Sequence, residues 1–295
     1  MNFKTSALYW SVRREFWENH SLIVAPLCAA ALGLLVFFYS LKHLPQSAMQ
    51  AIGAVDPSQS PLSLAMPYSH TGMLTTFAGI VVAIVYCVDA LYSERRDRSV
   101  LFWKSLPVSD GTTVLAKALI PLVVLPLLLF AMTAIAQFVI LLVSTVAVLI
   151  HGESVGLFWA KLPFFQIEVE MLYSLMVLAL WYAPLYAWLM LVSGWAKRTV
   201  FLWAVLPLLA IAAVEHIVFH TSHMLVLLRD RLVGFASTAY VMQMPDGSLV
   251  DPHFIPVSQL SAGRFLATPG LWIGLIIAAA LLAAAVRLRR YQEPI

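Results

Sequence analysis

The chain has 295 residues, of which 61% are hydrophobic and 11% are charged. Soluble domains carry about 25% charged residues, so this composition excludes an ordinary soluble protein and indicates a polytopic membrane protein. The formal net charge of +3 does not indicate nucleic-acid binding, because the basic residues gather at the ends of apolar runs, where membrane orientation requires them.

Residues 1–21 precede the first apolar run and mix aromatic with charged side chains. Trp10 and Trp17 alternate with Arg13 and Arg14. Aromatic rings concentrate at the headgroup level of membranes, and amphipathic helices of this composition lie in the interface. We therefore expect residues 1–21 to form an interfacial amphipathic helix rather than a frayed tail. No small-residue cleavage pattern follows the first run, so we expect no cleavable signal.

Six apolar runs in residues 22–295 are suited to membrane crossing, since one helical crossing needs about 20 apolar residues. They lie at 22–41, 71–88, 118–150, 171–194, 200–214 and 269–286. The predicted fold class is an all-α polytopic membrane protein with six transmembrane helices. Cys28 and Cys87 lie inside these runs and are expected to be small apolar side chains without a disulfide.

The run 118–150 is long enough for a hairpin of two crossings. It has no Gly, Asn or Asp turn at its middle, so we expect one long helix that Pro121 and Pro126, in its first third, kink near the cytoplasmic side. With six crossings and the N terminus inside, 13 of the 18 Lys and Arg residues are inside and 5 are outside. The outer five are Lys42, Lys161, Arg229, Arg231 and Arg264. A hairpin would change these counts to 12 and 6, so charge alone does not decide the second half.

Two outer segments follow from this topology. Residues 42–68 are rich in Pro, Ser and Gln and are expected to be an extended loop. Residues 223–268 form the predicted insertion between the fifth and sixth helices. It should contain a short amphipathic helix with Leu225, Leu228 and Leu232, and a hairpin turn within 240–250.

A charged island, Glu94 to Ser99, separates the second and third apolar runs. Ser99, Phe102, Trp103 and Leu106 then follow at helical spacing until Pro107. A short helix with such an apolar stripe fits a groove on another protein better than a simple connecting loop. Asp89, near the inner end of the second run, is expected to form a structural salt bridge, with the N-terminal arginines as candidate partners.

Glu215, His216, His220 and His223 form a second candidate group at the end of the fifth run. Their spacing could bring the imidazoles onto one helix face, as a metal site needs. Polar residues are ordinary at a membrane surface, however, so we expect no metal. A pH-sensitive or substrate-contacting outer gate and plain interfacial residues stay open. Trp181 and Trp188 share one face of the fourth run, either for helix packing or as a wall of a substrate path.

The order of these segments resembles the permease subunits of type-2 ABC exporters. Residues 9–16 resemble that family's interfacial entry helix. Glu94, Leu101, Leu106, Pro107 and Lys117 match its first intracellular loop, and the long fifth-to-sixth connection matches its outer region, which often holds short re-entrant helices. The chain departs from the pattern at Arg98-Ser99, where family members commonly have a small residue, often Gly.

The resemblance implies a coupling helix at about 94–107 that docks into a separate nucleotide-binding ATPase subunit. The residues implied for coupling are Glu94, Arg98, Leu101, Phe102, Trp103, Leu106 and Pro107. ATP and Mg²⁺ would bind to that partner and no cofactor to this chain, which has no Gly-x-x-x-x-Gly-Lys-Ser/Thr loop. Further implied partners are a second permease subunit, identical or related, and membrane lipid, with no nucleic acid.

The expected function is export of an amphipathic or hydrophobic substrate across a bacterial inner membrane, with both termini cytoplasmic and no enzyme activity of the chain alone. One alternative is a non-transporting sensor or assembly subunit that works with an ATPase. Another is an intramembrane protease, since Glu94-x-x-x-Arg98 and Phe219-x-x-x-His223 echo parts of protease motifs. The paired glutamates of such proteases are missing from the chain.

Overall fold

The computed structural model describes residues 3–41, 60–97, 108–152, 154–240 and 260–291. In this part of the chain the regular secondary structure consists of helices, and one isolated antiparallel bridge joins Tyr240 and Leu260. Six helical stretches of the described residues are long and apolar enough to span a membrane, which confirms the all-α polytopic fold class. They are Ser21–Ser40, Leu64–Arg96, Asp110–Ile150, Val155–Trp195, Val200–Phe219 and Pro269–Tyr291.

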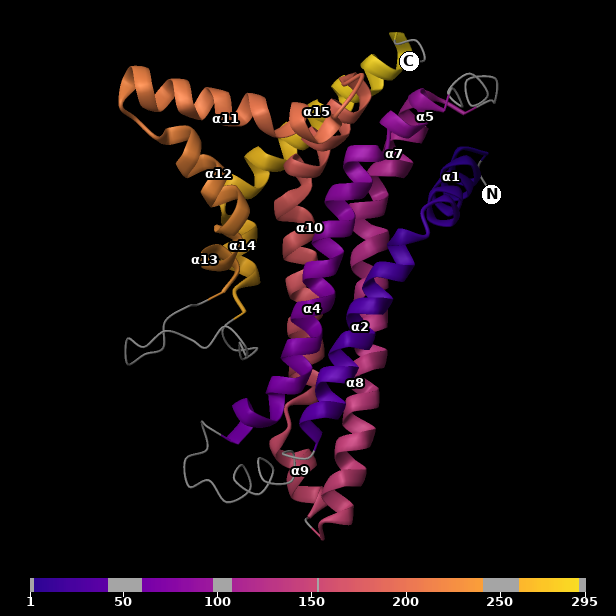
Figure 1. Cartoon of the computed structure of the whole chain (residues 1–295), viewed down its shortest axis with the longest axis vertical. Coiled ribbons are helices and arrows are strands. Elements are labelled where there is room, and N and C mark those ends of the chain that lie inside the picture. Colours follow the sequence, from indigo (N-terminus) through magenta and orange to yellow (C-terminus); the bar gives the residue numbers. More distant parts are fainter. Residues whose placement is uncertain (1–2, 42–59, 98–107, 153, 241–259, 292–295) are drawn as a thin grey trace.

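The individual helices of these spans and of the segments between them are labelled as in Figure 1. The first half contains α1 (Phe3–Glu18), α2 (Ser21–Ser40), α4 (Ser60–Asp89), α5 (Tyr92–Arg96), α7 (Asp110–Leu119) and α8 (Leu125–Ile150). The second half contains α9 (Val155–Lys161), α10 (Phe164–Trp195), α11 (Val200–Phe219), α12 (His223–Val233), α13 (Phe235–Ala239), α14 (Ala262–Ala267) and α15 (Pro269–Tyr291).

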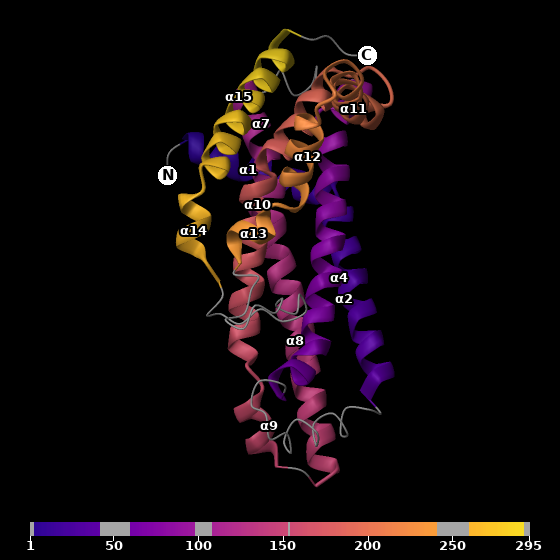
Figure 2. The same cartoon turned by 90° about the vertical axis from the view of Figure 1, so that its left-hand side faces the viewer.

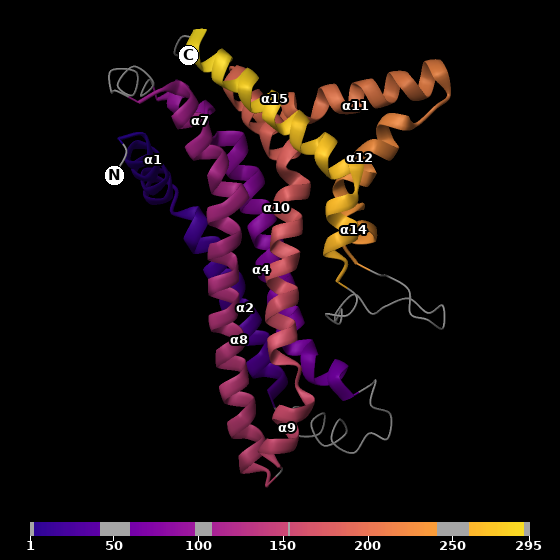
Figure 3. The same ribbon diagram turned by 180° about the vertical axis from the view of Figure 1, so that it is seen from behind.

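The helices α2, α4, α8 and α10 run side by side as a long bundle (Figures 1 and 3). Phe37, Tyr68, Ile140 and Phe158 are buried in one part of its core. Gly33 allows α2 to approach α4 closely, since a Cβ there would lie 2.9 Å from the Thr71 side chain. Both termini, α1 and α5 lie at one end of this bundle, which we call the terminal end (Figure 1).

The fourth helix of the bundle, α10, is the most enclosed, with 72% of its most apolar stretch buried. The sixth span, α15, packs beside it at the terminal end through Ala183, Ala187 and Ala278. Small side chains allow two membrane helices to approach closely, which suits this contact.

Residues 118–150 form one helix, as expected, rather than a hairpin. A π-helical turn at Ile120–Val124 joins α7 to α8, and the Leu125 N–H donates to the Ile120 carbonyl five residues earlier. Pro121 and Pro126 have no N–H to donate, so a regular α-helical ladder cannot continue through this stretch. The disturbance predicted from these prolines therefore takes the form of a widened turn.

Residues 60–70 depart from the sequence expectation. They were expected to belong to a loop and to the approach to the second span, but they form the first part of α4. Leu64, Ala65 and Tyr68 are buried in the bundle, in the same cluster as Phe37 and Ile140. Their burial stabilises the helix despite the intervening polar residues, which lower the average hydropathy of this stretch.

The helix α11 leaves the terminal end of α10 and extends away from the bundle (Figure 1). Its flanking residues Thr199 and His220 have positive φ of 46° and 50°, a conformation that non-glycine residues rarely adopt. The predicted short helix with Leu225, Leu228 and Leu232 is present as α12, which turns back toward the bundle. Then α13 and α14 lie beside α10 (Figures 1 and 2). The hairpin turn predicted after Tyr240 lies outside the described residues.

Candidate functional site

Of the residues expected to couple the chain to an ATPase, Glu94 is described by the structure. Arg98, Leu101, Phe102, Trp103, Leu106 and Pro107 lie outside the described residues. Glu94 belongs to α5 at the terminal end, and its side chain points into the molecule, with 7% of the residue exposed. Its carboxylate is therefore enclosed by neighbouring helices.

Three cations surround the Glu94 carboxylate. Its Oε1 lies 3.2 Å from Lys117 Nζ and 3.4 Å from Arg14 Nη2. Its Oε2 lies 2.9 Å from Arg289 Nη1. Glu94 thus connects α5 to α1, α7 and α15, which are far apart in the sequence.

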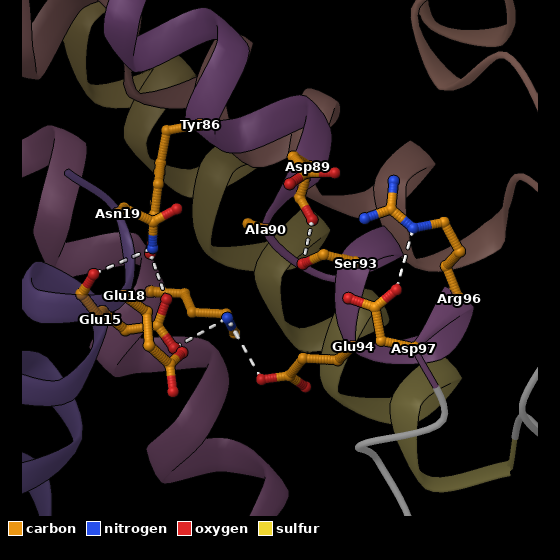
Figure 4. Close-up of a pocket in the computed structure, with 11 residues that line it drawn as sticks. Glu15, Glu18, Asn19, Tyr86, Asp89, Ala90, Ser93, Glu94, Arg96 and Asp97 are labelled. Atoms are coloured by element: carbon orange, nitrogen blue, oxygen red, sulfur yellow. Dashed lines mark hydrogen bonds and ion pairs between the residues drawn. The ribbon is translucent and has the colours of Figure 1, made fainter. Parts of the chain in front are cut away.

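A second carboxylate, that of Glu15, lies beside the first and is 1% exposed. Its Oε1 is 2.8 Å from Lys117 Nζ and 2.7 Å from Arg14 Nη2. The Tyr86 hydroxyl donates a 2.9 Å hydrogen bond to its Oε2. Lys117 therefore bridges Glu15 and Glu94. Figure 4 shows these two carboxylates from the side of the adjoining cavity.

These groups form what we call the ionic junction. Its residues are Arg14, Glu15, Tyr86, Glu94, Asp110, Lys117 and Arg289. Asp110 enters through a 3.2 Å ion pair with Arg289 Nε. The junction contains three carboxylates and three cations, so its charges balance. Buried charges are tolerated only when they are paired in this way, because taking an ion out of water costs several kcal/mol.

Glu15 and Arg14 of the junction have pKa values shifted in favour of their charged forms. Burial alone raises the pKa of Glu15, but the Lys117 ammonium and the Arg14 guanidinium outweigh it and hold the pKa below the ordinary value. Burial lowers the pKa of Arg14, and the neighbouring Glu15 carboxylate reverses that effect and raises it. Glu15 is therefore ionised throughout the physiological pH range.

A cavity of about 380 Å³ opens beside the junction (Figure 4). Glu15 and Glu94 line its inner part, and the exposed Asp89, Arg96 and Asp97 line its mouth. Asp89 forms no ion pair with another described residue, so the salt bridge expected between it and the N-terminal arginines is absent from this part of the chain. Arg14 instead meets Glu15, Glu18 and Glu94.

The short helix α5 is also attached to the end of α10. Arg95 Nη1 donates to the carbonyls of Gly194 and Ala196 at 2.6 and 3.1 Å. The Ser193 hydroxyl accepts the N–H groups of Leu91 and Tyr92 at 2.9 Å each. The chain that enters segment 98–107 is therefore held by buried polar contacts on two sides.

The candidates that were predicted to lie on the outer side, Glu215, His216, His220 and His223, occupy the end of α11 and the turn into α12. Glu215 accepts hydrogen bonds from Thr221 Oγ1 at 2.8 Å and from the backbone N–H groups of His223 and Met224 at 2.7 and 2.8 Å. It thus satisfies the free N–H groups at the start of α12. His216, His220 and His223 are exposed, and no group of three or more metal-ligating side chains is found among the described residues.

Trp181 and Trp188 of α10 both donate hydrogen bonds from their indole N–H groups to neighbouring helices. Trp188 Nε1 donates to the Ala204 carbonyl of α11 at 3.0 Å, and Trp181 Nε1 donates to the Arg231 carbonyl of α12 at 3.0 Å. The Tyr182 hydroxyl donates to the Leu232 carbonyl at 2.7 Å. This part of α10 therefore contacts both the fifth span and the connection between the fifth and sixth spans.

Arg14, Glu15, Arg95 and Arg289 were not predicted as site residues from the sequence. Lys117, directly before an apolar run, and Glu15, within an aromatic interfacial helix, were signals of buried pairing, because unpaired charges are costly there. The polar Thr221-Ser222 turn before α12 was a sequence signal for a helix start, where free N–H groups need a cap such as Glu215.

Comparison of the chain with protein-family models, with curated proteins and with solved structures found no match.

Proposed function

We propose that this chain is the permease subunit of an ABC transporter that exports an amphipathic or hydrophobic substrate. A separate ATPase subunit would bind ATP and Mg²⁺, and a second permease subunit, identical or related, would complete the path. The supporting facts are the six apolar spans, the bias of Lys and Arg toward one side, and an amphipathic segment at 98–107 suited to docking. The proposed location is a bacterial inner membrane with both termini in the cytoplasm.

The ionic junction is the observation that carries this proposal. An ATPase can drive a permease only if movement at the docking segment reaches the spanning helices. Glu94 and Arg95, a few residues before segment 98–107, are tied by buried contacts to α1, α7, α10 and α15. A displacement of segment 98–107 would therefore act on several helices at once.

The intramembrane protease has no comparable support. Figure 1 shows α5, which contains Glu94, and the turn between α11 and α12 on opposite sides of the molecule. Glu94 is paired with three cations, whereas His223 is exposed. These two parts of the suggested motif do not meet.

The first test is affinity purification from the native membrane in mild detergent, followed by mass spectrometry of co-purified proteins. The protein is compared with a variant that carries Trp103→Asp and Leu106→Asp. We expect a stoichiometric Walker-motif ATPase with the unmodified protein and its loss from the variant, because two carboxylates would face the apolar groove.

A matched control is Tyr291→Asp, since Tyr291 is 80% exposed at the same end of the molecule. This variant should retain the ATPase. Absence of an ATPase from all three samples would contradict the permease. Co-purification without substrate-stimulated ATP turnover and flux would favour the non-transporting subunit instead.

A further inference from the structure

The α12 helix places a charged residue against a spanning helix. Trp181 Nε1 of α10 donates to the Arg231 carbonyl of α12 at 3.0 Å, which fixes this part of α12 on α10. The Arg231 side chain is therefore held beside one of the six apolar spans.

The Arg231 guanidinium is enclosed by two helices. It lies over the Trp181 ring, 4.8 Å from its centroid. On the other side it lies against α15, where a Cβ at Gly274 would overlap its Nη2 and Cζ atoms. Its Nη1 donates to the Gly270 carbonyl at 3.3 Å. The absence of a side chain at Gly274 thus makes room for this cation.

Arg231 has no carboxylate partner among the described residues. Its Nη2 is buried and makes no hydrogen bond to the part of the chain that the structure describes. The charged residues Arg229, Asp230 and Arg264 are exposed and are not paired with it. A buried donor without a partner is costly, and a guanidinium presents a fork of donors that fits the two oxygens of a phosphate.

The surroundings of Arg231 indicate whether that phosphate belongs to a lipid or to a soluble molecule. Leu232 and Val233 of α12 are 52% and 62% exposed, and Trp272 and Ile273 of α15 are 54% and 57% exposed. A soluble phosphate would gain nothing from this apolar surface, whereas acyl chains would cover it. We propose that Arg231, seated between Trp181 and Gly274, is a binding site for the phosphate of a membrane phospholipid. The site does not depend on the permease function proposed above.

The test is native mass spectrometry of the delipidated protein titrated with phosphatidylglycerol, and in parallel with the matching diacylglycerol, which lacks the phosphate. We expect the phospholipid to bind more tightly than the diacylglycerol. Loss of a charge-assisted contact should weaken phospholipid binding about tenfold or more in Arg231→Gln. Arg229→Gln, which removes an exposed arginine from the same helix, should bind as the unmodified protein does.

A second pair of variants leaves Arg231 unchanged and adds a methyl group at a glycine. Gly274→Ala should displace the guanidinium and weaken phospholipid binding, whereas a Cβ at Gly263 of α14 would meet nothing within 4 Å, so Gly263→Ala should not. This pair decides the question if Arg231→Gln does not fold. Equal binding by both members of each pair would overturn the proposal. Displacement of the lipid by inorganic phosphate alone would also overturn it, because the site would then take a soluble anion.

Discussion

At the scale of single residues, Lys117 is the cation shared by both buried glutamates. Its ammonium lies 2.8 Å from Glu15 and 3.2 Å from Glu94. Lys117→Met leaves these carboxylates one cation short in a buried setting. We expect a loss of about 3 kcal/mol in stability, typical of removing one partner of a buried ion pair. The midpoint of thermal unfolding in detergent would measure it.

The control for Lys117→Met is Arg96→Gln. Arg96 pairs with Asp97 at 3.0 Å, and both side chains are more than half exposed. Such exposed pairs are screened by water and contribute little to stability, so the unfolding midpoint should hardly change. Equal losses in the two variants would mean that the ionic junction does not stabilise the fold.

The pKa of Glu15 predicts a dependence of stability on pH. It is lower in the folded protein than the ordinary value of 4.5, although burial opposes this, because Lys117 and Arg14 stabilise the carboxylate. The unfolded chain therefore binds more protons at Glu15 as the pH falls. The stabilisation is complete above the ordinary pKa and is lost as the pH falls through the folded pKa.

Glu15→Gln isolates this contribution. The unfolding midpoints of the two proteins, measured from neutral pH to pH 3, should differ most at neutral pH and converge in acid. A constant difference over the whole range would show that Glu15 does not titrate differently in the folded and unfolded states.

At the scale of elements, α10 is the helix to which the fifth-to-sixth connection is attached. Tyr182→Phe removes the hydroxyl that donates to the Leu232 carbonyl. We expect a cost of about 1 kcal/mol, which is roughly a fivefold increase in the opening of α12. Hydrogen exchange of the α12 amides would report it. Tyr9→Phe, on the exposed face of α1, should leave this exchange unchanged, and equal exchange in both variants would contradict the assignment.

The spans could be predicted from the sequence because the length of an apolar run decides whether a helix can cross a membrane. The start of α4 could not, because Leu64, Ala65 and Tyr68 are interspersed with polar residues and are buried by other helices. Helical periodicity identifies an apolar face but says nothing of which helix covers it.

The candidate site was only partly predictable for the same reason. The resemblance placed Glu94 and Lys117 in one loop motif, and the structure shows them as an ion pair. Their partners Arg14 and Arg289 are 80 and 195 residues from Glu94 in the chain. No local spacing connects charges so far apart, because the tertiary arrangement alone brings their helices together.

At the scale of the whole molecule, the two ends of the bundle should lie on opposite sides of a membrane. Lys197 is exposed after α10 and His151 is exposed after α8. In a Cys28→Ser background, where the remaining Cys87 is buried, Lys197→Cys and His151→Cys should react with an impermeant thiol reagent from opposite faces. The Lys and Arg bias predicts His151→Cys as the outer position.

Intact cells and opened membranes should therefore give different labelling patterns. His151→Cys should react in intact cells, and Lys197→Cys only after the membrane is opened. Reaction of both positions under the same condition would contradict the six-span topology. The reverse pattern would place both termini outside.

The π-helical turn at Ile120–Val124 has a consequence for the evolution of this helix. Such a turn holds one residue more than an α-helical turn, and one residue corresponds to about 100° of rotation. The turn lies between the buried Lys117 on one side and the buried Thr133 and Gln137 on the other. A chain with one residue fewer here would turn the segment before it by about 100° relative to the rest of the helix, and so turn Lys117 away from its two carboxylates. The length of this stretch therefore matters to the ionic junction as well as the identity of its residues.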